Sequence, residues 1–124
     1  MSRQSTKAKQ LFKEIADKYK VKLPEDTKRH EVFSYFETRN NYSEKFWNVV
    51  KKTFDKRKYR KSGIYDYTKT RQYHSMWDKH YDEVITLRFS DFTVTLTRVY
   101  TYQNTYGRKY HEYDYIEIQP NEAN

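Results

Sequence analysis

Seven basic side chains occur between Lys51 and Ser62, where Asp55 is the only acid. Clustered, flexible cations neutralise phosphates, and tyrosines placed among them are suited to stacking on the bases of a single strand. We therefore predict a nucleic-acid site on this run, in which Tyr59 and Tyr65 stack on the ligand. Its residues are Lys51, Lys52, Lys56, Arg57, Lys58, Tyr59, Arg60, Lys61 and Tyr65.

A solvated helix end is the alternative interpretation of this basic run. The dipole of a helix favours cations near its C-terminus, and the tyrosines would then pack on a sheet. The charge distribution favours a binding surface instead. Residues 1–62 carry 18 basic and 8 acidic groups, a net charge of +10, whereas residues 63–124 carry 7 and 9, a net charge of −2. Such asymmetry concentrates polyanions at one face, although charge that serves solubility alone would also give a positive total.

A second group of chemically active side chains consists of His74, Asp78, His80 and Asp82. If residues 71–81 formed a short helix, His74 and Asp78 would share a face, as metal ligands or the acidic groups of a nuclease require. Their spacing matches no ligand signature, however. The chain has no cysteine, and its two glycines begin no phosphate-binding loop. We therefore expect a protein that is not an enzyme and that binds no metal and no cofactor.

The segment from Val32 to Lys52 suggests a helix-turn-helix motif as another route to nucleic acid. Two helices joined at Asn40-Asn41 would place an aromatic and basic second helix in a major groove. The usual turn of this motif carries a glycine and small residues, which are absent here. Ordinary packing of two helices explains the same residues.

Apolar spacing predicts helices in the first half of the chain. Hydrophobic residues recur at helical spacing from about Thr6 to Lys20. Pro24 followed by two acids is typical of a first helical turn, so a second helix is expected from there to Asn41. A third helix is expected to begin at Ser43, with an apolar face that ends at Phe54 and lysines on its exposed side.

Strict alternation from Glu83 onward predicts antiparallel strands. A tight turn at Ser90-Asp91 would gather the apolar residues of two strands on one face. A second turn near Gly107 would return the chain as a third strand from Lys109 to Ile118. The expected cross-strand neighbours are Phe89 with Phe92, Leu87 with Val94, Ile85 with Leu96, Tyr113 with Leu96, Tyr115 with Val94 and Arg98 with His111.

These elements predict a single α+β domain over residues 1–124, in which about three N-terminal helices pack on a C-terminal three-stranded antiparallel β-meander. The helical basic half would span about 5–60, the meander about 83–118 and a short polar tail 119–124. Aromatic residues form 19% of the chain, so we expect an ordered core built mainly from Phe, Tyr and Trp. No stretch approaches the roughly 20 apolar residues of a membrane span, which predicts a cytoplasmic protein without membrane contact.

Two functions remain open from the sequence. The first is a small basic protein that binds the phosphate backbone of DNA or RNA through the basic run. The alternative is a non-enzymatic inhibitor from a phage or mobile element, anti-CRISPR-like or directed at another defence system, that binds a nucleic-acid enzyme or its protein–RNA complex. Salt dependence separates them, because phosphate contacts weaken steeply with salt. A free edge of the third strand would also permit a homodimer.

Overall fold

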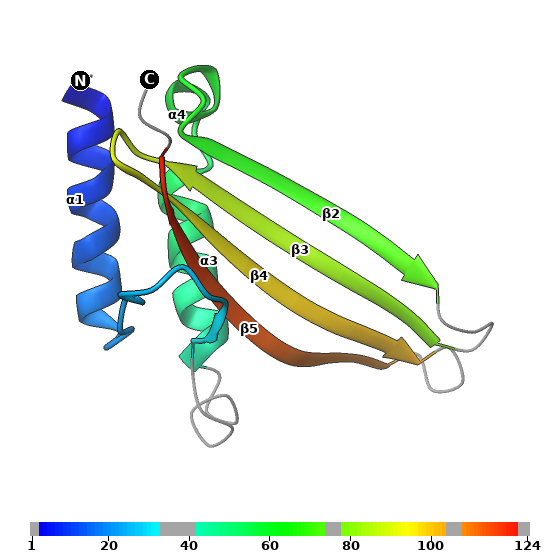
Figure 1. The fold of residues 1–124 in the computed structure, drawn as a ribbon. Helices are drawn as coiled ribbons and strands as arrows, with labels where there is room; N and C mark the ends of the chain where they lie inside the picture. Colours follow the sequence, from blue (N-terminus) through cyan, green and yellow to red (C-terminus); the bar gives the residue numbers. More distant parts are fainter. Residues whose placement is uncertain (1–2, 33–41, 74–77, 104–107, 122–124) are drawn as a thin grey trace.

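The fold is a five-stranded antiparallel sheet with helices on one face (Figure 1). The computed structural model describes residues 3–32, 42–73, 78–103 and 108–121. The described helices are α1 (Arg3–Lys18), α3 (Tyr42–Phe54) and α4 (Arg57–Lys61). The strands are β1 (His30–Glu31), β2 (Tyr65–Tyr73), β3 (Asp78–Arg88), β4 (Phe92–Gln103) and β5 (Arg108–Pro120), in the spatial order β1-β5-β4-β3-β2.

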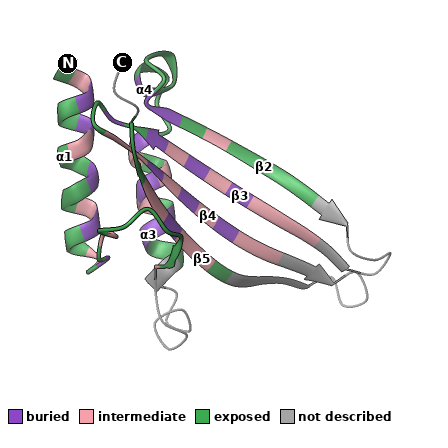
Figure 2. Cartoon of the chain, in the orientation of Figure 1, coloured by how far each residue is buried: buried purple, intermediate pink, exposed green. Residues whose placement is uncertain are grey.

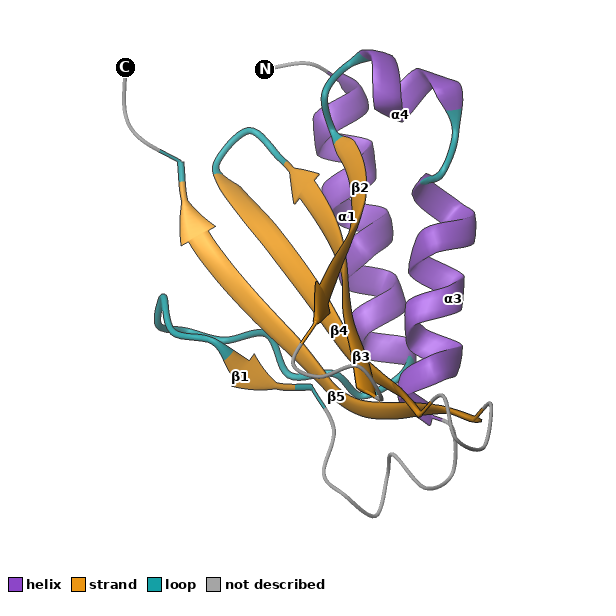
Figure 3. Ribbon diagram, turned by 90° about the vertical axis from the view of Figure 1, so that its right-hand side faces the viewer, coloured by secondary structure: helices purple, strands orange, loops and turns teal. Residues whose placement is uncertain are grey.

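Helices α1 and α3 lie side by side against one end of the four long strands, which then extend past them (Figure 1). Figure 3 shows both helices on the same side of the sheet and the short β1 beside β5. Strand β2 is therefore one edge of the sheet, and in the described structure the two residues of β1 cover part of the other edge.

The predicted three-stranded meander was wrong, because β1 and β2 also belong to the sheet. Strand β2 and the start of β3 occupy residues 65–73 and 78–82, which precede the predicted meander and overlap the short helix considered over 71–81. The cause lies in the alternation of this segment, which places Tyr65 and Tyr67 opposite Leu87 and Ile85 of β3. Burial of these rings against apolar partners stabilises a strand. This outweighs the helix that the spacing of the later tyrosines suggested.

The predicted second helix does not begin at Pro24. Residues 24–32 form a turn and strand β1, and residues 33–41 lie outside the described part of the chain. The Asp26 carboxylate accepts hydrogen bonds from the Lys28 backbone N–H at 3.0 Å and from His30 Nε2 at 2.6 Å. An Asp side chain that bonds the backbone two residues ahead stabilises a turn, and the same residue type also starts helices. The sequence could not distinguish these two uses.

The β3–β4 hairpin has the predicted register, with Ile85 opposite Leu96 and Leu87 opposite Val94. At its turn, the Phe89 N–H donates to the Phe92 carbonyl at 3.0 Å. Alternation on both arms of one short turn is sufficient to fix such a register.

The predicted register of the last strand was wrong. Ile116 and Ile118 of β5, and not Tyr113 and Tyr115, lie opposite Leu96 and Val94. The pairing between β4 and β5 also shifts by one residue at Val99/Tyr100. The predicted register is already displaced by two residues before this β-bulge, because His111 pairs with Tyr100 and not with Arg98. The bulge adds one unpaired residue, which moves the partner of Arg98 to Asp114 and exchanges the two faces of the rest of β5.

The core fills the space between the two long helices and the helix-facing side of the sheet (Figure 2). Helical spacing of three or four residues brings the buried side chains of α1 and α3 onto single faces. The largest fully buried side chains are Phe12, Phe54, Ile85, Leu87, Ile116, Val50 and Val94. The predicted core, built mainly from Phe, Tyr and Trp, is therefore only partly correct: aromatic rings share the core with a larger number of aliphatic side chains, which dominate its sheet side.

The turn between β3 and β4 is attached to α1. Phe12 of α1 contacts Phe89 at a ring-centroid distance of 6.0 Å. Lys9 Nζ lies 2.9 Å from the Asp91 carboxylate, one turn of the helix earlier. The first helix and the central hairpin are therefore joined by both an aromatic contact and an ion pair.

Candidate nucleic-acid interface

The basic run spans two helices with a break between them. Helix α3 ends at Phe54, and Lys56, with φ −128° and ψ 147°, is the extended N-cap residue of α4. Helix α4 ends at Lys61, and the N–H of its C-cap residue Ser62 donates to the Lys58 carbonyl at 3.3 Å. Gly63 follows with φ +78°, a left-handed conformation that favours glycine, and turns the chain into β2.

Most cations of this run are exposed and have no carboxylate partner. Arg60 is the exception, because its Nε donates to Asp55 Oδ1 at 2.7 Å. Among the described residues, no carboxylate lies within ion-pair distance of the other six cations. Lys51 is half-buried with its Nζ 4.0 Å from the centre of the Tyr67 ring. The exposed members are Lys52, Lys56, Arg57, Lys58 and Lys61.

The predicted stacking role of Tyr59 and Tyr65 is wrong, because both rings belong to the core. Tyr59 is 4% exposed and contacts Phe54 edge-on at 5.5 Å, and Tyr65 is 3% exposed. Burial raises the pKa of the Tyr65 phenol to about 12. For these two rings the alternative interpretation is correct: they pack on the fold. The exposed part of the basic run therefore consists of cations without these two tyrosines.

Helix α1 brings further cations to the same end of the molecule. The Gln4 side-chain amide donates to the Lys58 carbonyl at 3.2 Å, so the first turn of α1 contacts α4. Arg3 and Lys7, on the first two turns of α1, are exposed. Figure 1 shows the start of α1 and α4 at one end of the fold. We call this surface the basic end; it comprises Arg3, Lys7, Lys52, Lys56, Arg57, Lys58 and Lys61.

Sequence reasoning missed Arg3 and Lys7 as members of this surface. The contact that brings them there joins residues 54 positions apart. No local pattern in the sequence predicts which end of α1 meets α4. The dispersed lysines of α1 thus gave no signal.

A second cluster of charges is buried between α3 and the sheet. Arg98 is 3% exposed, and its Nε lies 3.4 Å from Asp114 Oδ1. Its guanidinium lies 5.5 Å from the Trp47 ring centre and 5.3 Å from that of Tyr100. Glu83, opposite Arg98 on β3, is 8% exposed. The expected neighbour His111 pairs with Tyr100 instead, so these charges form an internal cluster that is closed to a polyanion.

The histidines and acids considered as metal ligands do not lie on one helix. His74 lies outside the described residues, and Asp78, His80 and Asp82 belong to strand β3, so the helical face proposed for them does not form. Within the described parts of the chain, no group of three or more potential ligands is close enough to hold a metal ion.

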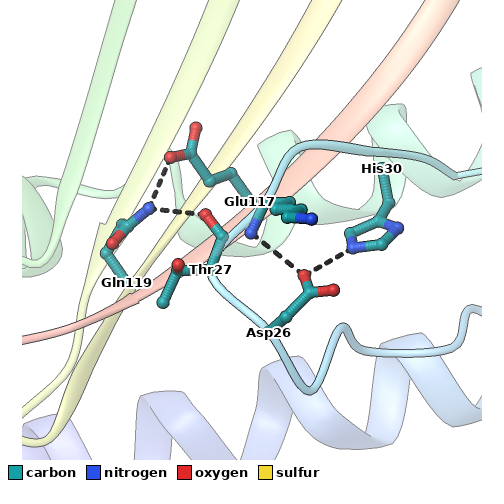
Figure 4. A network of polar contacts seen from close by, with 6 residues as sticks. Asp26, Thr27, His30, Glu117 and Gln119 are labelled. Carbon is teal, nitrogen blue, oxygen red and sulfur yellow. Dashed lines mark hydrogen bonds and ion pairs between the residues drawn. The ribbon is translucent and has the colours of Figure 1, made fainter.

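The turn before β1 forms a separate polar network against β5 (Figure 4). Gln119 Nε2 donates to the Thr27 carbonyl at 2.7 Å and to Glu117 Oε1 at 2.6 Å. The hydrogen bond from His30 lowers the pKa of the Asp26 carboxyl. A hollow of about 500 Å³ beside this turn is lined by both acids and bases: Lys22, Leu23, Pro24, Glu25, Asp26, His30 and Glu31. The mixed charge of this lining makes the hollow a poor site for a polyanion. The hydrogen bonds of the network hold the turn before β1 against β5.

Scans against protein-family models, curated proteins and solved structures find no match to this chain. In the portion of the chain that the structure describes, no helix is both long enough and apolar enough to cross a bilayer.

Proposed function

We propose that the protein binds nucleic acid by contacting backbone phosphates with the basic end. The observation that carries the proposal is the convergence of seven exposed cations from α1, α3 and α4, none of which has a carboxylate partner among the described residues. Cations that lack internal partners lose no ion pair when they bind a phosphate. The ligand class is DNA or RNA, and we place the protein in the cytoplasm, where both are accessible.

Helix capping explains only part of this charge. Helix α3 ends at Phe54 with Lys51 and Lys52 in its last turn, and these two are enough to complement its dipole. The cations from Lys56 to Lys61 follow on a separate five-residue helix, whose dipole is short. Their number and their proximity to Arg3 support a binding surface.

The proposal is tested by reversing three charges of the basic end. We expect Lys56→Glu, Arg57→Glu and Lys58→Glu together to abolish retention on DNA and RNA while the melting temperature stays unchanged, because all three side chains are exposed. For the wild-type protein, a surface that makes about six phosphate contacts should lose about a thousandfold in affinity between 50 and 200 mM salt. Affinity would be measured by fluorescence anisotropy across that salt range.

The matched control is Lys13→Glu, Lys22→Glu and Lys28→Glu, which changes net charge equally at exposed positions outside the basic end. Retention should survive in this control. Equal loss in both triple variants would mean that only net charge matters, and unchanged retention in the first would refute the proposed site. Weak salt dependence would instead favour the inhibitor that docks on a protein.

A further inference from the structure

Three more cations extend from the basic end along strand β2, and each lies over a tyrosine ring. Lys51 Nζ of α3 is 4.0 Å from the ring centre of Tyr67. Lys69 Nζ and Arg71 Cζ, both on β2, are 5.0 Å and 5.2 Å from the ring centre of Tyr81. We call Lys51, Lys69 and Arg71 the cation track.

All three members lie on the helix-facing side of the sheet. Tyr67, Lys69 and Arg71 alternate along β2 and therefore point to one face. That face is the helix-facing one, because Ile85, opposite Tyr67, is fully buried in the core. The contact of Lys51 with Tyr67 places a cation of α3 next in line before those of β2.

The ring contacts prepare these cations for anion binding. A lysine ammonium has three N–H donors and an arginine guanidinium has five, so a cation over a ring keeps donors for a phosphate. The attraction between cation and ring restricts the side chain, and less conformational entropy is then lost on binding. Lysine and arginine on an edge strand also discourage pairing between sheets, but that role requires neither the ring contacts nor Lys51 of α3.

The surroundings of the track permit a polyanion. Strand β2 is an edge of the sheet, so no strand lies beyond it in the described structure. Lys69 and Arg71 are exposed. The acid opposite Lys69 is Glu83, which is only 8% exposed and also lies opposite Arg98. It therefore presents little negative surface to a ligand.

We infer that a single strand of nucleic acid held at the basic end continues along β2, with its phosphates on Lys51, Lys69 and Arg71. This inference rests on the proposed function and extends it to the form of the ligand. From Tyr65 to Arg71 the strand spans about 20 Å, the axial length of about six stacked nucleotides. The cations form a single file, and the opposite face of β2 carries Asp66, so the edge offers no second row for the other strand of a duplex.

The test removes two cations of the track without reversing charge. In Lys69→Gln with Arg71→Gln, binding of a 20-nucleotide single strand should depend less on salt, with the slope of log affinity against log salt about 1.4 less negative than for the wild type. A six-nucleotide strand, which the basic end alone can hold, should bind the variant within twofold of the wild type. Lys51→Gln should act in the same direction with about half the change in slope. Thermal melting would verify that each variant is folded.

The control is Lys13→Gln with Lys22→Gln, which removes the same charge at exposed positions outside the track. An unchanged slope in the track variant, while the triple charge reversal still abolishes retention, would overturn the track and leave the basic end intact. An equal change of slope with a 20-base-pair duplex would overturn the assignment to a single strand. Wild-type protein that binds no oligonucleotide would refute the basic end and the track together.

Discussion

Arg98 is a charged side chain held within the apolar interface between α3 and the sheet. It is 3% exposed, and its Nε is 3.4 Å from the carboxylate of Asp114. Burial of an ion pair costs hydration on both partners, and removal of one partner leaves the other charge uncompensated. Arg98 could not be assigned from the sequence, because its partner depends on the β4–β5 register, which a bulge displaces.

We expect Arg98→Met to lower the free energy of unfolding by about 3 kcal/mol, because it removes the cation that lies beside the buried carboxylate of Asp114. Chemical denaturation monitored by circular dichroism measures the change. Arg88→Met is the matched control, since Arg88 is exposed and 3.8 Å from the carboxylate of Asp66. The control should shift stability by less than about 0.5 kcal/mol. Equal effects of the two substitutions would show that burial of Arg98 contributes nothing.

At the scale of elements, the sequence predicted the parts whose contacts are local. Helix α1 and the β3–β4 hairpin follow from the spacing of their own apolar residues, and both are present within a few residues of the expected bounds. Strand β2 was missed because its alternation mixes tyrosines with cations and threonines, and only pairing with β3 shows which face is buried. In the candidate site, too, local features were predictable and long-range contacts were not. The cations between Lys51 and Lys61 were predictable from the sequence. The addition of Arg3 and Lys7 and the burial of Tyr59 and Tyr65 depend on distant partners.

The passage from α4 to β2 depends on the backbone of Gly63. Its φ is +78°, and a Cβ added there would meet no heavy atom within 4 Å. We therefore expect Gly63→Ala to lower the free energy of unfolding by about 1 kcal/mol through backbone conformation alone. Gly63→Asn should cost less, since asparagine tolerates this conformation. Denaturation of both variants tests this order, and a wild-type value for Gly63→Ala would show that the positive φ is not needed.

At the scale of the whole molecule, positive charge is concentrated in the first half of the chain. The net charge of +10 over residues 1–62 is displayed largely on the helices, whereas tyrosine rings from both halves are built into the fold. Tyr65 on β2 is buried and Tyr100 on β4 is partly buried, and both lie on the helix-facing side of the sheet. Burial raises the pKa of each of these two phenols to about 12.

The shifted phenols make the protein sensitive to alkali. Between about pH 10 and pH 12 the unfolded chain loses phenolic protons that the folded protein keeps, so the free energy of unfolding should fall as pH rises through this window. Below it, the contribution is fully present. Denaturation midpoints at about pH 9 and pH 11 measure the loss. Tyr65→Phe should reduce this pH dependence and Tyr113→Phe, at a side chain 49% exposed, should not; the reverse order would contradict the assignment.

The attachment of α1 to the β3–β4 turn has a consequence for how the chain acquires its structure during synthesis. Phe12 contacts Phe89, and Lys9 contacts Asp91, so the first helix packs against residues made more than 70 positions later. Until those residues leave the ribosome, the apolar face of α1 has no hairpin to cover it. We therefore expect the first segment to emerge to be among the last to become protected, and folding to wait for most of the chain.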